Sequence, residues 1–183
     1  MNPIDSTRTR KAILQAANKV VLRDGSNALT LDAVAKEAGV SKGGLLYHFP
    51  SKDALIMAMV DDLIQSADQA MRQLQADDPN TYGSWTRAYI NVCRESDEAD
   101  SISAAMIPAA ASNPELLAPM RNMYESWQKK LDDDLGDRGK SMLIRLALDG
   151  LGMVELFKLS PPRGERRDEL ISLLLKMTEP EER

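Results

Sequence analysis

The sequence is poor in the residues that form disulfides and most metal sites. Its 183 residues include one cysteine, Cys93, and one histidine, His48. A single cysteine cannot form a disulfide within the chain, and the usual zinc sites draw their ligands mainly from these two residue types. We therefore expect no internal disulfide, no bound metal and no cofactor.

Long hydrophobic runs are also absent. No segment approaches the roughly 18 consecutive apolar residues that a membrane-spanning helix needs. Residues 1–10 are polar, and the apolar segment that would follow them in a secretory signal is missing. We expect a cytoplasmic protein that makes no contact with a membrane.

Catalytic groups do not occur in the combinations that enzymes use. Acid–base chemistry needs two placed groups, and nucleophilic catalysis needs a serine or cysteine beside a base. Cys93 and His48 fall in different predicted parts of the chain, and no glycine-rich phosphate loop is present. We expect that the protein is not an enzyme.

Charge is distributed unevenly along the chain. The net charge is −5, yet residues 1–52 carry eight basic and four acidic side chains, and the remainder carries 15 basic and 24 acidic ones. A positive end on an acidic body suits a protein that presents one face to phosphates. Charge alone also fits an ordinary solvated surface.

Helical periodicity runs through nearly the whole sequence. Asp24-Gly25 is a typical helix end, and Asn113-Pro114 has the cap-then-proline order that begins a helix. The expected helices cover about residues 7–23, 30–38, 41–49, 51–76, 81–95, 99–111, 114–134, 138–159 and 164–177. We predict an all-α fold of about nine helices without a sheet.

The most informative segment is Thr30–Phe49, which has the pattern of a helix-turn-helix. Ala35 is small enough for two crossing helices to touch, and Gly39 tolerates the positive φ of a tight turn. Ser41 can cap the second helix and leave its first amides directed at a phosphate. The apolar positions of the shared core are Val34, Ala38, Val40 and Leu45. An ordinary helical corner is the alternative.

The flanking residues favour contact with DNA. Gly43 and Gly44 lie inside a predicted helix, where each glycine costs on the order of 1 kcal/mol relative to alanine. A helix that presses its backbone into a groove has a reason to accept that cost. Tyr47 offers a hydroxyl, and Lys42 and Lys52 begin successive helices near the same backbone. Lys42 fits a guanine contact and a phosphate contact equally well.

Taken in order, these motifs resemble the signature of the TetR family of transcriptional repressors. The resemblance covers residues 8 to about 60. It rests on the glycine after the first helix, Thr30–Gly39, Val40–Gly43, Leu46–Phe49 and Ser51–Leu55. It implies a helix-turn-helix DNA-binding domain at 1–50, a connecting helix at 51–76, and a ligand-sensing and dimerisation domain at 77–183.

The resemblance and the residue types together give a set of DNA-binding candidates. They are Thr30, Ser41, Lys42, Gly43, Gly44, Tyr47, His48 and Lys52. His48 has two open roles, packing behind the recognition helix or contact with a phosphate. Gly43 and Gly44 remove two side chains that other family members use to read bases, so specificity is expected to rest on few contacts.

In the second half of the chain, aromatic and sulfur-containing residues suggest a ligand pocket. Methionines line adaptable pockets, and aromatic rings provide flat apolar walls. The candidates are Trp85, Tyr89, Cys93, Met106, Met120, Tyr124, Trp127, Asp149 and Met153. Ordinary core packing is the alternative for each of them. Asp149 lies in an apolar stretch, where it either pairs with Arg145 or neutralises a cationic ligand.

The last two predicted helices carry more apolar surface than one subunit covers. The dimerisation candidates are Leu143, Leu146, Gly150, Phe157, Leu170 and Leu174. Two such helices from each subunit would form a four-helix bundle in a symmetric homodimer, which requires a palindromic DNA operator.

The sequence thus predicts a transcriptional repressor that binds double-stranded DNA. A small, largely apolar or cationic effector would release the repressor from the DNA. The effector would tilt the connecting helix, with the break at Asp77-Asp78-Pro79 acting as a hinge. A DNA-binding regulator without a small-molecule ligand, controlled by a protein partner or by its expression level, is the alternative.

Overall fold

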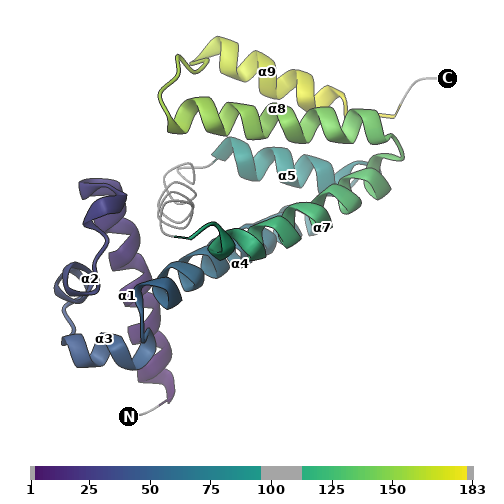
Figure 1. Cartoon of the computed structure of the whole chain (residues 1–183). Coiled ribbons are helices and arrows are strands. Elements are labelled where there is room, and N and C mark those ends of the chain that lie inside the picture. The colour runs from purple at the N-terminus through teal and green to yellow at the C-terminus, as the bar shows by residue number, and fades with distance from the viewer. Residues whose placement is uncertain (1–2, 96–112, 181–183) are drawn as a thin grey trace. The chain divides into compact units, whose positions relative to one another are not determined.

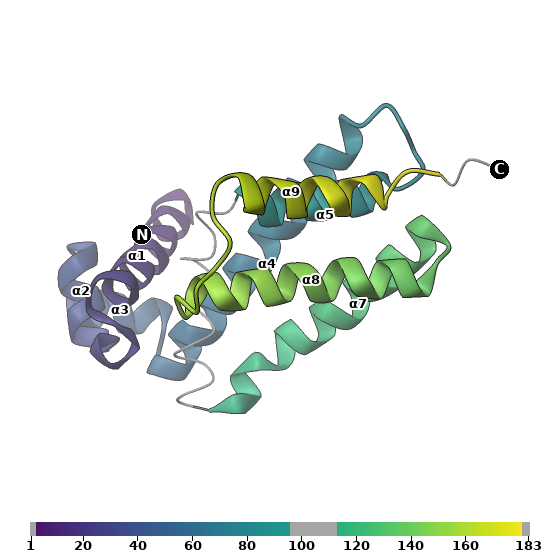
Figure 2. The same cartoon turned by 90° about the horizontal axis from the view of Figure 1, so that it is seen from above.

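A computed structural model of the chain describes residues 3–95 and 113–180. Within these two ranges the regular structure is entirely helical, which confirms the predicted all-α fold (Figures 1 and 2). The helix predicted at about 99–111 lies outside the described residues. No helix in the described ranges is long and apolar enough to cross a membrane.

The helices agree closely with the predicted ranges. They are α1 (Pro3–Asp24), η1 (Ser26–Ala28), α2 (Leu31–Ala38), α3 (Lys42–His48), α4 (Lys52–Ala76), α5 (Ser84–Glu95), η2 (Pro114–Leu117), α7 (Ala118–Leu135), α8 (Arg138–Leu156) and α9 (Glu165–Lys176). Helix α8 ends earlier than predicted, because the backbone turns left-handed at Lys158 and Ser160, with φ of 53° and 52°.

The chain forms two compact units. The first contains residues up to Ile64 and a later segment that ends at Arg121. The second contains the chain from Gln65 through α5 and from Asn122 onward. Helix α4 is continuous from Lys52 to Ala76, so it begins in the first unit and ends in the second.

In the first unit, α1 packs against α2, and α2 packs against α3. Helix α1 contributes Ile13, Ala17 and Val20, which recur at helical spacing and are fully buried. Val34 of α2 and Leu45 of α3 complete this small core. The short helices α2 and α3 are therefore held by apolar burial on α1.

In the second unit, five helices share one core. Figures 1 and 2 show α8 and α9 side by side over α5, and α5 contacts both of them. Each helix supplies at least one fully buried aliphatic side chain. In chain order these are Met71, Ile90, Leu131, Ile144 and Ile171. Burial of such side chains contributes roughly 1.5–3 kcal/mol each.

The loop between α4 and α5 is fixed by Arg87. Its Nε lies 2.7 Å from Oδ2 of Asp78, and its Nη2 donates to the carbonyl of Asn80 at 2.7 Å. Gly83 has φ of 69°, and a β-carbon there would lie 2.6 Å from the carbonyl oxygen of Thr178. These contacts anchor the loop after α4 to α5. They argue against a hinge at Asp77-Asp78-Pro79, whose motion stays a prediction.

The first turn of α5 is capped by a side chain from another helix. Oδ2 of Asp134, on α7, accepts hydrogen bonds from the backbone N–H of Thr86 at 2.9 Å and from its Oγ1 at 2.6 Å. Thr86 is fully buried. The free amides at a helix N-terminus favour a carboxylate, so this contact ties α5 to α7.

Substitution of this carboxylate should therefore destabilise the second unit. We expect Asp134→Ala to lower the free energy of unfolding by about 1–3 kcal/mol, since it leaves buried donors without a partner. Thermal denaturation followed by circular dichroism should show a Tm several degrees lower. Asp133→Ala, at the exposed neighbouring position, is the control, and equal Tm values for the two variants would contradict the assignment.

Candidate nucleic-acid interface and candidate ligand site

The turn between α2 and α3 has the geometry that the sequence predicts. Gly39 adopts φ 67° and ψ 27°. The N–H of Val40 donates to the carbonyl of Ala35 at 3.0 Å, and the N–H of Gly39 donates to that of Lys36 at 3.3 Å. This pair of bonds is a Schellman motif, which satisfies the last carbonyls of α2. It ends α2 and redirects the chain into α3.

Hydroxyl caps begin three successive helices. Oγ1 of Thr30 accepts from the N–H of Ala33 at 3.2 Å, and Oγ of Ser41 accepts from that of Gly44 at 3.0 Å. A third cap joins Oγ of Ser51 to the N–H of Ala54 at 3.1 Å. The capping roles predicted for Thr30 and Ser41 are confirmed.

Helix α3 divides its side chains between the core and solvent. Leu45 is fully buried, whereas Tyr47 is 72% exposed and the Lys42 side chain is 61% exposed. Leu46, which is not among the predicted DNA-binding residues, is also exposed. The half-buried His48 ring meets the Tyr47 ring edge-on at 5.2 Å. An aromatic hydroxyl and a lysine amine therefore lie on an accessible helix face.

Lys42 forms an ion pair within the helix-turn-helix. Its Nζ lies 2.9 Å from Oδ1 of Asp32 on α2. Exposed ion pairs of this kind stabilise a protein by about 0–1 kcal/mol, so the amine can exchange Asp32 for another anion. Lys52 is half-buried at the first position of α4.

The two glycines of α3 differ in their surroundings. A β-carbon on Gly44 would lie 3.2 Å from the capping Oγ of Ser41. A β-carbon on Gly43 would meet no atom of residues 3–95 and 113–180 within 4 Å. Packing among these residues thus gives a reason for glycine at Gly44 but none at Gly43.

The predicted aromatic residues of the second unit lie together. The rings of Trp85 and Tyr89 stack at 5.9 Å with an interplanar angle of 8°, and the Trp127 ring meets them edge-on at 6.2 and 5.8 Å. All three are buried, and Cys93 packs against the same core. These side chains fill the space between them, as ordinary core packing would.

Asp149 lies beside this cluster and contacts two side chains on its two oxygens. The hydroxyl of Tyr124 donates to its Oδ1 at 3.2 Å, and Nη1 of Arg145 lies 3.4 Å from its Oδ2. The predicted ion pair with Arg145 is therefore present. Burial raises the pKa of Asp149 above its ordinary value, against the lowering effects of Arg145 and of the hydroxyls of Tyr124 and Tyr89.

Three methionines that are predicted ligand-site residues do not belong to this aromatic cluster. Met153 is 58% exposed on α8, which corrects its expected place in an enclosed pocket. Met120 is buried but belongs to the first unit. Met106 lies outside the described residues.

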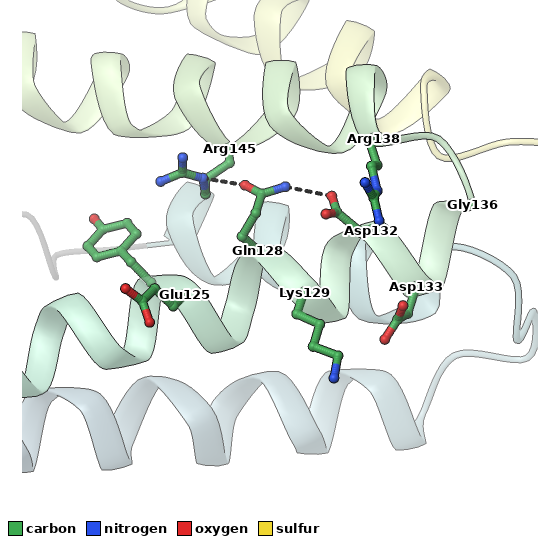
Figure 3. Close-up of a pocket in the computed structure, with 9 residues that line it drawn as sticks. Glu125, Gln128, Lys129, Asp132, Asp133, Gly136, Arg138 and Arg145 are labelled. Atoms are coloured by element: carbon green, nitrogen blue, oxygen red, sulfur yellow. Dashed lines mark hydrogen bonds between the residues drawn. The ribbon is translucent and has the colours of Figure 1, made fainter.

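A groove of about 660 Å³ lies between α7 and α8 (Figure 3). Its lining residues are Tyr124, Glu125, Gln128, Lys129, Asp132, Asp133, Gly136, Arg138 and Arg145. Nε2 of Gln128 donates to Oδ1 of Asp132 at 2.7 Å, and Oε1 of Gln128 accepts from Nε of Arg145. The groove is therefore charged and differs from the largely apolar pocket that the residue types predict. Of the predicted ligand residues, Tyr124 lines it.

Helix α8 also carries an apolar face that is exposed among the described residues. Leu143, Leu146 and Phe157 are 56%, 54% and 54% exposed. On α9, by contrast, Leu174 is buried in the core of its own subunit and Leu170 packs against that core. Both side chains thus pack within the chain, and their role in dimerisation stays a prediction. The neighbouring Leu173 is the exposed leucine of α9.

Comparison with known protein families identifies both halves of the chain. Residues 13–59 match the model for bacterial regulatory proteins of the tetR family. Residues 83–179 match the model for the tetracyclin repressor-like C-terminal domain. The second match alone covers more than half of the chain.

Individual relatives are similar to part of the chain. The transcriptional regulator RutR of Escherichia coli is 44% identical over 55 residues, which are 30% of this chain and 26% of RutR. The transcriptional regulator TtgR of Pseudomonas putida is 31% identical over 74 residues, which are 40% of this chain and 35% of TtgR. The chain thus spans about a third of the length of these relatives or less.

Solved structures resemble the chain over nearly its whole length. A transcriptional regulator from Rhodococcus sp. Rha1 superposes with a TM-score of 0.75 at 19% identity, covering 92% of this chain and 95% of that one. At this identity the likeness shows a shared fold.

The free space around Gly43 yields a test of the interface. We expect Gly43→Ala to raise the Tm, because alanine favours a helix by up to about 1 kcal/mol. It should also weaken binding to DNA, because its methyl group stands on the accessible face of α3. Gly44→Ala is the comparison variant, whose gain in Tm should be smaller because of Ser41. Unchanged DNA affinity in Gly43→Ala, measured by gel shift, would contradict a close approach at this face.

Proposed function

The chain belongs to the TetR family of transcriptional regulators, and from this premise we propose that it is a repressor that binds a palindromic operator as a homodimer and is released by a small-molecule effector. The observation that carries the proposal is the Schellman turn at Gly39, after which α3 exposes Lys42 and Tyr47. The positive charge of residues 1–52 supports binding to phosphates.

In the proposed complex, α3 enters the major groove of double-stranded DNA. Lys42 leaves Asp32 to contact a guanine or a phosphate, and Tyr47 donates to the DNA backbone. The remaining candidates contact the backbone or allow its close approach. These are Thr30, Ser41, Gly43, Gly44, His48 and Lys52. Because two of these positions carry no side chain, sequence discrimination rests on few direct contacts.

Homodimerisation is supported by the uncovered apolar face of α8. Leu143, Leu146 and Phe157 expose more than half of their surface in one subunit, and Gly150 lies on the same exposed side. A twofold axis along this face would bury the same residues of both subunits against each other. The resulting dimer has two identical reading helices, which is why the operator should be a palindrome.

Release is proposed to occur through α4. A ligand that binds one conformation of the second unit more tightly shifts the dimer toward that conformation. The contacts of Arg87 with Asp78 and Asn80 hold the end of α4 to α5. A rearrangement of the second unit would therefore move α4 itself instead of being absorbed in the loop.

A regulator without a small-molecule ligand is the second candidate. It is favoured by the packing of Trp85, Tyr89 and Trp127, which fill the space that an apolar effector would need. In that case a protein partner controls the repressor. Effector binding to the isolated protein distinguishes the two candidates.

Lys42 provides the direct test of DNA binding. In a gel shift against the DNA flanking its own gene, Lys42→Ala should weaken specific binding by about 1–3 kcal/mol, roughly 5- to 150-fold. Wild-type affinity should fall steeply as salt rises, because phosphate contacts release counterions. Lys129→Ala makes the same charge change outside the interface and should leave binding intact. An equal loss of DNA affinity in both variants would contradict the assignment of α3 as the helix that reads DNA.

Leu146 provides the test of dimerisation. We expect Leu146→Asp to shift the protein from dimer to monomer in analytical ultracentrifugation, because burying an unpaired carboxylate opposes association. Operator binding should weaken in parallel. Leu22→Asp places the same charge on an exposed leucine of α1 and should remain dimeric. A dimeric Leu146→Asp variant would rule out the α8 face as the interface.

A further inference from the structure

The guanidinium of Arg145 occupies a position suited to a bound cation. Its Cζ lies 5.7 Å from the centroid of the Tyr124 ring, and its Nη1 lies 3.4 Å from Oδ2 of Asp149. A carboxylate beside an aromatic ring is a common way for proteins to bind organic cations. The chain therefore places its own cation in an arrangement that fits an external one.

Arg145 is held more firmly at its other contact. Its Nε donates to Oε1 of Gln128 in a close hydrogen bond, whereas the contact with Asp149 is at the long end of hydrogen-bond distances. The other carboxylate oxygen of Asp149 accepts a 3.2 Å hydrogen bond from the Tyr124 hydroxyl, which does not depend on Arg145. The guanidinium can thus give up Asp149 and keep Gln128.

The groove between α7 and α8 provides access to these residues. Tyr124 and Arg145 both line it, and both contact Asp149, which is not itself a lining residue. The lining carries three acidic residues, Glu125, Asp132 and Asp133, and three basic ones, Lys129, Arg138 and Arg145, so displacement of Arg145 from the groove would leave its wall with an excess of negative charge. The Asp149 side chain retains 29% exposure, so it is not sealed from solvent.

We propose that Asp149 and Tyr124 form a binding site for a small planar organic cation of the amidinium or guanidinium type, and that Arg145 is an internal surrogate which this cation displaces. A planar cation can donate two parallel hydrogen bonds to a carboxylate, as arginine does. The proposal names the chemical class of the effector and so rests on the proposed function.

Displacement of Arg145 would reach α4 through α7. Arg145 joins α8 to Gln128 on α7, and Lys130 on α7 lies 3.4 Å from Oδ1 of Asp68 on α4. The same lysine amine lies 5.3 Å from the centroid of the Trp85 ring. A cation at Asp149 would therefore change the contacts of the helix that α4 packs against.

Benzamidinium is the probe for this site, with the neutral isostere benzamide as its matched control. Isothermal titration calorimetry on the full chain should detect benzamidinium and not benzamide, and the fluorescence of Trp85 and Trp127 should change with it. Arg145→Met removes the internal competitor and keeps an apolar stem. We expect it to bind benzamidinium about tenfold more tightly than the wild type.

Asp149→Asn should abolish benzamidinium binding while its far-UV circular dichroism stays that of the wild type. Arg145→Ala is measured as a second variant in case Arg145→Met is misfolded. If neither Arg145 variant gains affinity, if benzamide binds as well as benzamidinium, or if Asp149→Asn retains binding, the proposal is overturned.

Measuring operator binding in the absence of benzamidinium distinguishes a failure of the proposed cation site from a failure of the proposed repressor function. If the wild type binds its operator but benzamidinium fails these tests, the effector site is wrong and the repressor assignment stands. If benzamidinium behaves as expected but no operator is bound, the cation site stands and the proposed function fails.

Discussion

The left-handed backbone at Gly39 is the constraint on which the candidate interface depends. A side chain with a β-carbon is strained at φ of 67°, so the tight change of direction between α2 and α3 favours glycine. The direction of α3 then decides that Leu45 enters the core and that Lys42 and Tyr47 meet solvent. The surface offered to DNA is thus set by a residue that need not touch it.

Helix α8 has three faces, which are directed at the core of the second unit, at solvent and at α7. Ile144 and Leu148 enter the core of the subunit, whereas Leu143 and Leu146 point away from it. A third face carries the arginine that contacts α7. The proposed subunit contact and the proposed cation site therefore share one rigid element, so a rotation of this helix that suits one must alter the other.

The sequence predicted best what depends on neighbouring residues. The hydroxyl caps and the glycine turn each involve positions within six residues, and both were found. Which leucines of α9 face the core was harder to predict. Leu173 and Leu174 are separated by about 100° around the helix, and only packing decides that Leu174 is the buried one. Gln128 was missed because its role depends on Arg145 from another helix. The repeat of Tyr124, Gln128 and Asp132 at every fourth position was the available signal.

Because α4 is long and continuous, a small rotation at one end of this helix produces a larger displacement at its other end. Its 25 residues contain no glycine or proline and extend about 37 Å at 1.5 Å per residue. A rigid rod of that length, rotated by about 5° at one end, displaces its other end by roughly 3 Å, and a twofold partner can double the change in separation. Successive turns of the duplex are about 34 Å apart, so in the proposed homodimer such a displacement would put the two α3 helices out of step with the grooves.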